Sequence, residues 1–224
     1  MILCIADVVD AEMLADVRNA LARASFEDGR LTAGWHARAV KHNQQLARGS
    51  LRDRLQEKLR QVLAANEVIR AAALPRRWSG LLFSRYESGM DYGMHVDDAL
   101  MGLGGPGELR SDLSFTLFLS SPDEYEGGEL IMDTAGQEAS YKLPAGALIL
   151  YPSTTLHRVA PVRSGARLAA VGWIQSAVRD PAGREILFDL DRARRQIFEA
   201  NGKSPAFDLV AKSYANLLRR WAEI

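Results

Sequence analysis

The sequence predicts an α+β protein in which a sandwich or barrel of short strands is flanked by helices. From about residue 79 to residue 176, short runs rich in Leu, Ile, Val, Phe and Tyr alternate with Gly, Pro and Asp. Such a succession of strands and tight turns is typical of sandwiches and barrels. On both sides of this region, apolar residues recur at helical spacing. With 224 residues, 47% of them hydrophobic, the chain can bury a sizeable core.

The elements before the strand-rich region are a strand and two helices. Residues 1–8 are apolar and predict a buried strand, and residues 11–24 carry Met13, Leu14 and Val17 at helical spacing. A second helix is predicted over residues 51–72, with leucines repeating every four residues, and Pro75 ends it. The polar segment between these helices contains Asn43-Gln44-Gln45.

Eight strands are predicted in the central region, and two helices follow them. The strands lie near residues 80–86, 92–97, 113–119, 129–133, 138–143, 147–151, 156–161 and 167–175. From about residue 180, two apolar stripes predict a helical pair joined by a turn at Asn201-Gly202. We interpret this pair as packed on the sheet, with a dimer contact as the alternative.

Composition excludes several classes of protein. Lysine and arginine together number 28, as do aspartate and glutamate, and this zero net charge argues against a general nucleic-acid binder. No run approaches the roughly 18–20 apolar residues of a membrane span, so no membrane partner is expected. The single cysteine, Cys4, excludes an intramolecular disulfide and a multi-thiolate zinc site. A cytoplasmic protein is expected, and a homo-oligomer is left open.

Three side chains form a candidate metal site. His95 and Asp97 are two residues apart in a predicted strand and so project from the same face. His157 borders another predicted strand, sixty-two residues later. Two histidines and one carboxylate make the facial triad of non-haem Fe(II) oxygenases, which leaves coordination positions open for other ligands.

Arg167 lies ten residues after His157 in a strand that is otherwise almost wholly apolar. A buried guanidinium needs an anionic partner, because an unpaired buried charge is costly. The partner is either a bound carboxylate, which suits the guanidinium fork, or a structural carboxylate such as Asp112. A hairpin turning at residues 163–165 would pair the strands of His157 and Arg167 directly.

With these residues in place, the sequence resembles the iron- and 2-oxoglutarate-dependent dioxygenases of the prolyl-hydroxylase-like branch, and within it the PKHD-type hydroxylases. The metal motif is typical of the superfamily, and flanking strings are typical of the subgroup over nearly the full length. The matching segments are residues 43–45, 83–86, 95–97, 116–120, 125–130, 150–153, 157–159, 173–176 and 216–221.

The resemblance implies a double-stranded β-helix, a jelly-roll core similar to that of cupins, in which the strands of His157 and Arg167 lie in opposite sheets. It implies that His95, Asp97 and His157 bind Fe(II). It also implies that Arg167 and Tyr86 bind 2-oxoglutarate. Thr116 lies in the strand where some relatives have a tyrosine for the same purpose. The residues that would line the substrate site are Tyr92, Asn43 and Gln45.

The implied activity is hydroxylation of an unidentified substrate by O2 and 2-oxoglutarate, releasing succinate and CO2, with L-ascorbate as a reductant. Two alternatives use the same residues: a non-catalytic sensor of iron or 2-oxoglutarate, and a cupin-like metal enzyme that uses no oxoacid. The expected organisation is an N-terminal strand and helices over residues 1–77, the dioxygenase domain over 78–177 and a C-terminal helical segment over 178–224.

Overall fold

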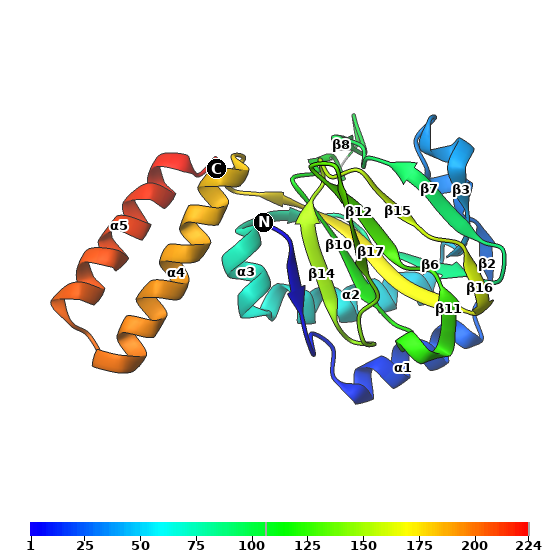
Figure 1. Ribbon diagram of the computed structural model, residues 1–224, viewed down its shortest axis with the longest axis horizontal. Helices are drawn as coiled ribbons and strands as arrows, with labels where there is room; N and C mark the ends of the chain where they lie inside the picture. Colours follow the sequence, from blue (N-terminus) through cyan, green and yellow to red (C-terminus); the bar gives the residue numbers. More distant parts are fainter. Residues whose placement is uncertain (106, 224) are drawn as a thin grey trace.

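Two facing antiparallel sheets form the centre of the protein in the computed structural model, which describes residues 1–105 and 107–223 (Figure 1). Pro106 and Ile224, which belong to the predicted central and C-terminal segments, lie outside the described residues. The α+β class is confirmed. The predicted boundaries at residues 77/78 and 177/178 stay predictions. The first falls within β5 (Pro75–Trp78), which pairs with the central strand β17 (Arg167–Ser176).

The larger sheet joins strands from the N-terminal segment to strands from the central region. Its order is β1 (Leu3–Ile5), β14 (Leu148–Pro152), β10 (Leu113–Phe118), β17, β6 (Leu82–Tyr86), β4 (Gln44–Leu46) and β2 (Phe26–Asp28). The N-terminal segment therefore contributes strands to this sheet as well as helices.

The smaller sheet faces it. Its order is β13 (Gln137–Tyr141), β12 (Leu130–Thr134), β15 (His157–Val159), β7 (Asp91–His95) and β3 (Lys41–His42). Two short pairs complete the strands, β11 (Tyr125–Gly127) with β16 (Val162–Gly165) and β8 (Leu100–Met101) with β9 (Leu109–Arg110). Each of the eight predicted strands corresponds to one of these.

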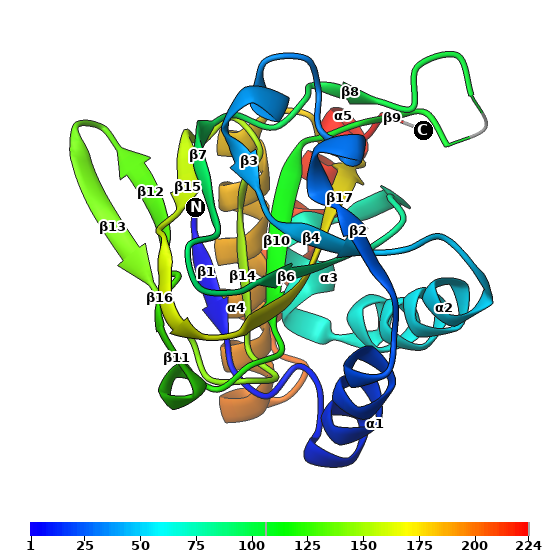
Figure 2. The same cartoon turned by 90° about the vertical axis from the view of Figure 1, so that its right-hand side faces the viewer.

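The strands of His157 and Arg167 do not form a hairpin. β15 belongs to the smaller sheet and β17 to the larger one, while the intervening β16 pairs with β11. The direct pairing predicted from the turn at residues 163–165 is wrong, and the arrangement implied by the resemblance is confirmed. Figure 2 shows the two sheets from the side on which β2, β3 and β4 lie.

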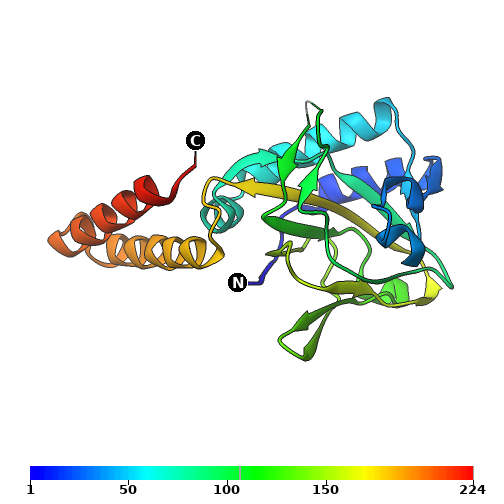
Figure 3. The same cartoon turned by 90° about the horizontal axis from the view of Figure 1, so that it is seen from above.

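Three helices cover the outer face of the larger sheet (Figure 3). They are α1 (Ala11–Ala22), α2 (Ser50–Ala65) and α3 (Glu67–Ala73). Buried leucines of α2 pack with Phe83 and Leu117 of the sheet in one hydrophobic core. The single helix predicted over residues 51–72 is in fact two helices, because Asn66 leaves the helical conformation and its side chain accepts a hydrogen bond from the Ile69 amide, 3.0 Å away.

The C-terminal helices α4 (Pro181–Asn201) and α5 (Pro205–Trp221) form a hairpin beside the sheets rather than across them (Figures 1 and 3). The buried residues of α4 lie in its first half, which contacts α3, and α5 has no buried residue and packs on α4. Our interpretation of a pair packed on the sheet is therefore wrong for α5, while α4 reaches the core of the larger sheet through Phe188. Within the described residues, no helix combines the length and the apolar character needed to cross a membrane.

Candidate metal centre

His95, Asp97 and His157 come together between the two sheets. One candidate ligand atom from each lies within 4.8 Å of the others. His95 ends β7 and His157 begins β15, and the two residues are paired across these antiparallel strands. The imidazole centroids are 4.2 Å apart, and His157 Nε2 lies 3.9 Å from Asp97 Oδ2.

The route by which Asp97 reaches this cluster differs from the prediction. β7 ends at His95, so Asp97 does not lie on the same strand face as that histidine. The carboxylate is instead held by Ser114 of β10, whose hydroxyl donates a 2.6 Å hydrogen bond to Asp97 Oδ2. Ser114 Oγ also lies 2.8 Å from Ser153 Oγ. The carboxylate is thus oriented from the opposite sheet.

Both imidazoles are arranged to present Nε2. His95 Nδ1 lies 2.8 Å from the carbonyl of Gly93, and His157 Nδ1 lies 2.9 Å from that of Thr155. A carbonyl can only accept, so each Nδ1 carries a proton, which leaves Nε2 as the nitrogen that can bind a metal. Burial, and then repulsion from His157, lowers the pKa of His95 to about 4. Two oriented imidazoles next to a carboxylate form a donor set that suits a divalent transition metal.

Arg167 is the largest fully buried side chain of the described residues, with 1% of its surface exposed. Its guanidinium lies over the rings of Tyr86 and Phe118, at 5.2 and 5.4 Å. Space for it exists because Gly128, at φ +67°, has no side chain; a Cβ there would lie 3.1 Å from Arg167 Cδ.

No carboxylate of the described part of the chain forms an ion pair with Arg167, and its Nε has no hydrogen-bond partner there. The alternative partner, Asp112, is bound to Arg110 instead, at 2.7 Å. An unpaired buried guanidinium is costly. The site therefore fits a bound carboxylate.

A cavity of about 560 Å³ joins the triad to Arg167. Tyr86, Thr116, Tyr92 and Gln45, which the resemblance associates with cosubstrate or substrate, all line it. Tyr92 stacks on His95 with ring centroids 3.7 Å apart. Asn43 is not among the lining residues. It is buried beneath Gly29, where a Cβ would lie 1.8 Å from Asn43 Oδ1.

Several residues of this site escaped the sequence analysis. Tyr151, whose hydroxyl lies 3.4 Å from His157 Nε2, and Ser114 both line the cavity. Burial strongly raises the pKa of Tyr151, so its phenol stays protonated. A usable signal existed for Ser114: it alternates with Thr116 as a polar position in the otherwise apolar strand β10, and alternating residues share a face.

Comparison with known proteins agrees with this geometry. Family profiles described as 2OG-Fe(II) oxygenase superfamily and PKHD-type hydroxylase C-terminal domain match residues 81–175 and 182–223. The chain is 58% identical to a PKHD-type hydroxylase of Synechococcus elongatus, with 100% of both chains covered. It is 52% identical to one of Gloeothece citriformis, again over 100% of both.

Two solved structures of low sequence identity have a fold similar to that of this chain. A prolyl-4-hydroxylase of Pseudomonas putida has a TM-score of 0.54 at 20% identity, covering 78% of this chain and 92% of its own. HygX of Streptomyces hygroscopicus, solved with nickel, 2-oxoglutarate and hygromycin B, has a TM-score of 0.55 at 14% identity, covering 79% and 84%. The predicted jelly-roll core is thereby confirmed.

Proposed function

This chain belongs to the PKHD-type hydroxylases of the 2OG-Fe(II) oxygenase superfamily, and from that premise we propose that it hydroxylates a C–H bond of its substrate with O2 while converting 2-oxoglutarate to succinate and CO2. One oxygen atom enters the substrate and the other enters succinate. The observation that carries the proposal is the convergence of His95, Asp97 and His157 on one cavity with a buried, unpaired Arg167.

In this proposal His95, Asp97 and His157 hold Fe(II), which when bound supplies the site for the oxoacid and for O2 activation. The Gly93 and Thr155 carbonyls fix the two rings, and Ser114 fixes the carboxylate. These contacts keep the three donors aimed at one point before the metal arrives, which is the usual task of groups around metal ligands.

Arg167 would bind the carboxylate of 2-oxoglutarate that lies away from the metal. A guanidinium binds both oxygens of a carboxylate, and burial excludes competing water. Tyr86 and Thr116 line the same cavity from the strands on either side of β17. Their hydroxyls would complete the binding of the oxoacid.

The test is succinate formation from 2-oxoglutarate in air, using anaerobically purified protein with added Fe(II), with and without L-ascorbate. We expect Fe(II)-dependent succinate from the natural protein and none from His95→Ala, Asp97→Ala or His157→Ala, because each variant loses a metal donor. Ascorbate would extend turnover by keeping the metal reduced.

A binding measurement separates the roles. Arg167→Gln should keep metal affinity and weaken 2-oxoglutarate binding at least tenfold, since a charge-assisted fork is worth about 1.5–3 kcal/mol. Metal and oxoacid binding without succinate formation under any condition would favour the non-catalytic sensor. Normal activity in any of the three donor variants would refute the metal assignment.

A further inference from the structure

One side of the cavity carries positive charge that the metal and 2-oxoglutarate do not use. Lys41, Arg48 and Arg52 all line it. They come from β3, from the segment after β4 and from the first turn of α2, on the side of the sandwich where the two sheets are joined by residues 41–46 (Figure 2). Arg167, in contrast, lies on the central strand of the larger sheet.

These three cations lack a directly bound carboxylate in the described part of the chain. Across residues 1–105 and 107–223, none of the three forms an ion pair, and Arg52 Nε is buried without a hydrogen-bond partner. The carboxylates that line the cavity are Asp97, which belongs to the candidate metal site, and Asp98, which is 52% exposed and lies 3.9 Å from His36.

Lys41 is the most constrained of the three, because only 4% of its surface is exposed. Its Nζ donates a 3.0 Å hydrogen bond to Thr32 Oγ1 and lies 5.1 Å from the centroid of the Tyr92 ring, which stacks on His95. An ammonium has three N–H donors, and one described hydrogen bond leaves two for a ligand. Lys41 therefore links the candidate metal site to the cationic side of the cavity.

One further hydrogen-bond donor without a partner lines the same cavity. The buried indole Nε1 of Trp173, which also lines the cavity, has no partner. Buried polar groups are almost always hydrogen-bonded, so each exception calls for an explanation. Unpaired cations and an unpaired N–H donor along one cavity are explained together by a ligand that supplies acceptors and negative charge.

We infer that the primary substrate is a small molecule with an oxyanionic group, carboxylate or phosphate, which Lys41, Arg48 and Arg52 bind while the bond to be hydroxylated faces the metal site. This inference rests on the proposed function, because it takes the triad and Arg167 as occupied by metal and 2-oxoglutarate. It narrows the substrate to anionic compounds, and it makes the three cations determinants of specificity.

The test measures binding of simple anions to full-length protein loaded with Zn(II) and 2-oxoglutarate, so that the triad and Arg167 are filled and no turnover occurs. The probes are benzoate and phenyl phosphate, with uncharged benzamide as the matched control, detected by saturation-transfer NMR. We expect saturable binding of at least one anion and none of benzamide. The tighter of the two anions identifies the oxyanionic group.

Variants then locate the site. Arg52→Gln, Arg48→Gln and Lys41→Met should each raise the dissociation constant of the anion about tenfold, because each removes a charge-assisted contact. Arg54→Gln is the matched control: this residue lies on the same helix, is exposed and does not line the cavity. It should leave the dissociation constant unchanged. The Arg48→Gln and Arg52→Gln variants keep the test valid if Lys41→Met folds poorly.

Benzamide binding as tightly as benzoate would overturn the inference, and so would an Arg52→Gln variant with the natural dissociation constant. Failure of the proposed function has a different signature. In that case the Zn(II)-loaded protein would not retain 2-oxoglutarate, or Arg167→Gln would retain it as well as the natural protein does. The two failures are therefore distinguishable within one series of samples.

Discussion

At the scale of single residues, Ser114 is the clearest addition that the structure makes. Its hydroxyl is buried, donates to Asp97 Oδ2 at 2.6 Å and lies 2.8 Å from Ser153 Oγ. Ser114→Ala removes the donor and leaves the carboxylate free to rotate. Loss of such an outer contact typically lowers metal affinity about 10–100-fold. We expect that loss for Fe(II) or Zn(II), measured by competition with a chromogenic chelator.

Two further serine variants make this result specific. Ser153→Ala removes only the partner of Ser114 and should have a smaller effect. Ser88→Ala removes an exposed hydroxyl that donates to the Arg163 carbonyl and does not line the cavity of the triad, so it should have no effect. Equal metal affinity in Ser114→Ala and Ser88→Ala would show that Asp97 does not depend on this hydrogen bond.

The site residues that the sequence could predict are those whose role follows from the residue type and its local sequence alone. Two histidines, a carboxylate and an arginine in apolar strands imply a ligand because burial without one is unfavourable. Lys41 was missed because its role depends on the residues around it in the cavity, whereas Ser114 could have been found from its alternation with Thr116 in β10. Asn43 was included on the resemblance, yet its side chain packs under Gly29 and is not itself part of the cavity lining.

At the scale of elements, periodicity located the helices and strands but not all of their ends. The leucine repeat ends at Leu63, but apolar residues such as Ile69 and Ala72 follow Asn66, so the pattern alone could not show that α2 and α3 are separate helices. Similarly, β7 stops at His95 although its alternating pattern extends to Asp97. In both cases a side-chain hydrogen bond, of Asn66 or of Asp97, accompanies the change in backbone direction.

The hairpin of α4 and α5 depends on Asp191, a nearly fully buried carboxylate. It accepts hydrogen bonds from Arg194 and Arg195, at 2.7 and 2.8 Å. Arg195 then reaches Glu67 of α3, and Arg194 lies 4.0 Å over the Tyr214 ring of α5. Burial alone would raise the pKa of Asp191, but the hydrogen bonds from the two arginines outweigh it and lower this pKa below 3.8.

Asp191→Asn should therefore destabilise the protein by about 2 kcal/mol at pH 7. A carboxyl with a lowered pKa in the folded state stabilises that state above its unfolded pKa and ceases to do so as pH falls through the folded pKa. The difference between the variant and the natural protein should thus shrink below pH 3.8. Urea unfolding at pH 7 and near pH 3 measures it, if the protein stays folded in acid.

Asp189→Asn is the matched control, because Asp189 is exposed on the same helix and its ion pair with Arg192 is long, at 3.9 Å. Its effect should stay within about 0.5 kcal/mol. A pH-independent loss of stability in Asp191→Asn would show that shape, rather than the charge on Asp191, holds the hairpin together.

At the scale of the whole molecule, the topology brings the functional residues together from widely separated segments. His95 and His157 lie on the smaller sheet, and Asp97 lies two residues beyond the end of β7. Arg167, Thr116 and Ser114 lie on the larger sheet. Local patterns could not predict this meeting, and a hairpin between β15 and β17 was the simpler expectation from the short turn. The family resemblance supplied the arrangement because it carries long-range information that periodicity lacks.

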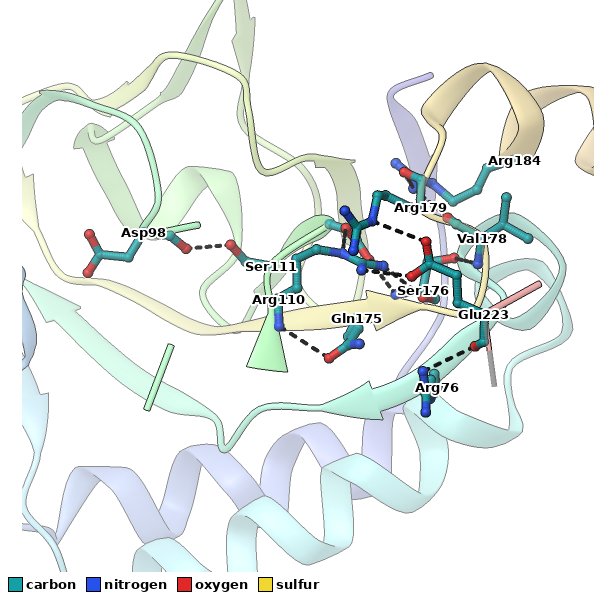
Figure 4. Close-up of polar contacts among 11 residues, drawn as sticks. Arg76, Asp98, Arg110, Ser111, Gln175, Ser176, Val178, Arg179, Arg184 and Glu223 are labelled. Carbon is teal, nitrogen blue, oxygen red and sulfur yellow. Dashed lines mark hydrogen bonds and ion pairs between the residues drawn. The ribbon is translucent and has the colours of Figure 1, made fainter. Parts of the chain in front are cut away.

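The end of the described chain is joined back to the sheets by one cluster of polar contacts (Figure 4). Glu223 binds Arg110 of β9 at 2.9 Å and Arg179 at 3.1 Å. Its amide donates to the Ala177 carbonyl at 2.7 Å, and Val178 forms a bridge with Ala222. The cluster thus closes the helical hairpin at its base, where β17 leads into α4.

Glu223→Gln should loosen this closure without disturbing the metal site. The neighbouring arginines lower the pKa of Glu223, so it is charged at neutral pH and the variant removes both ion pairs. Arg110 nevertheless keeps its two hydrogen bonds to Asp112, at 2.7 and 3.0 Å. We expect faster hydrogen exchange at residues 177–179 and 221–223, unchanged exchange in β10, and unchanged metal affinity.

Salt should have a similar effect on the natural protein, because salt screens exposed ion pairs. In 1 M NaCl the Debye length is about 3 Å, so we expect much of the same increase in hydrogen exchange. Uniformly faster exchange across both sheets would instead mean that this cluster supports the whole fold.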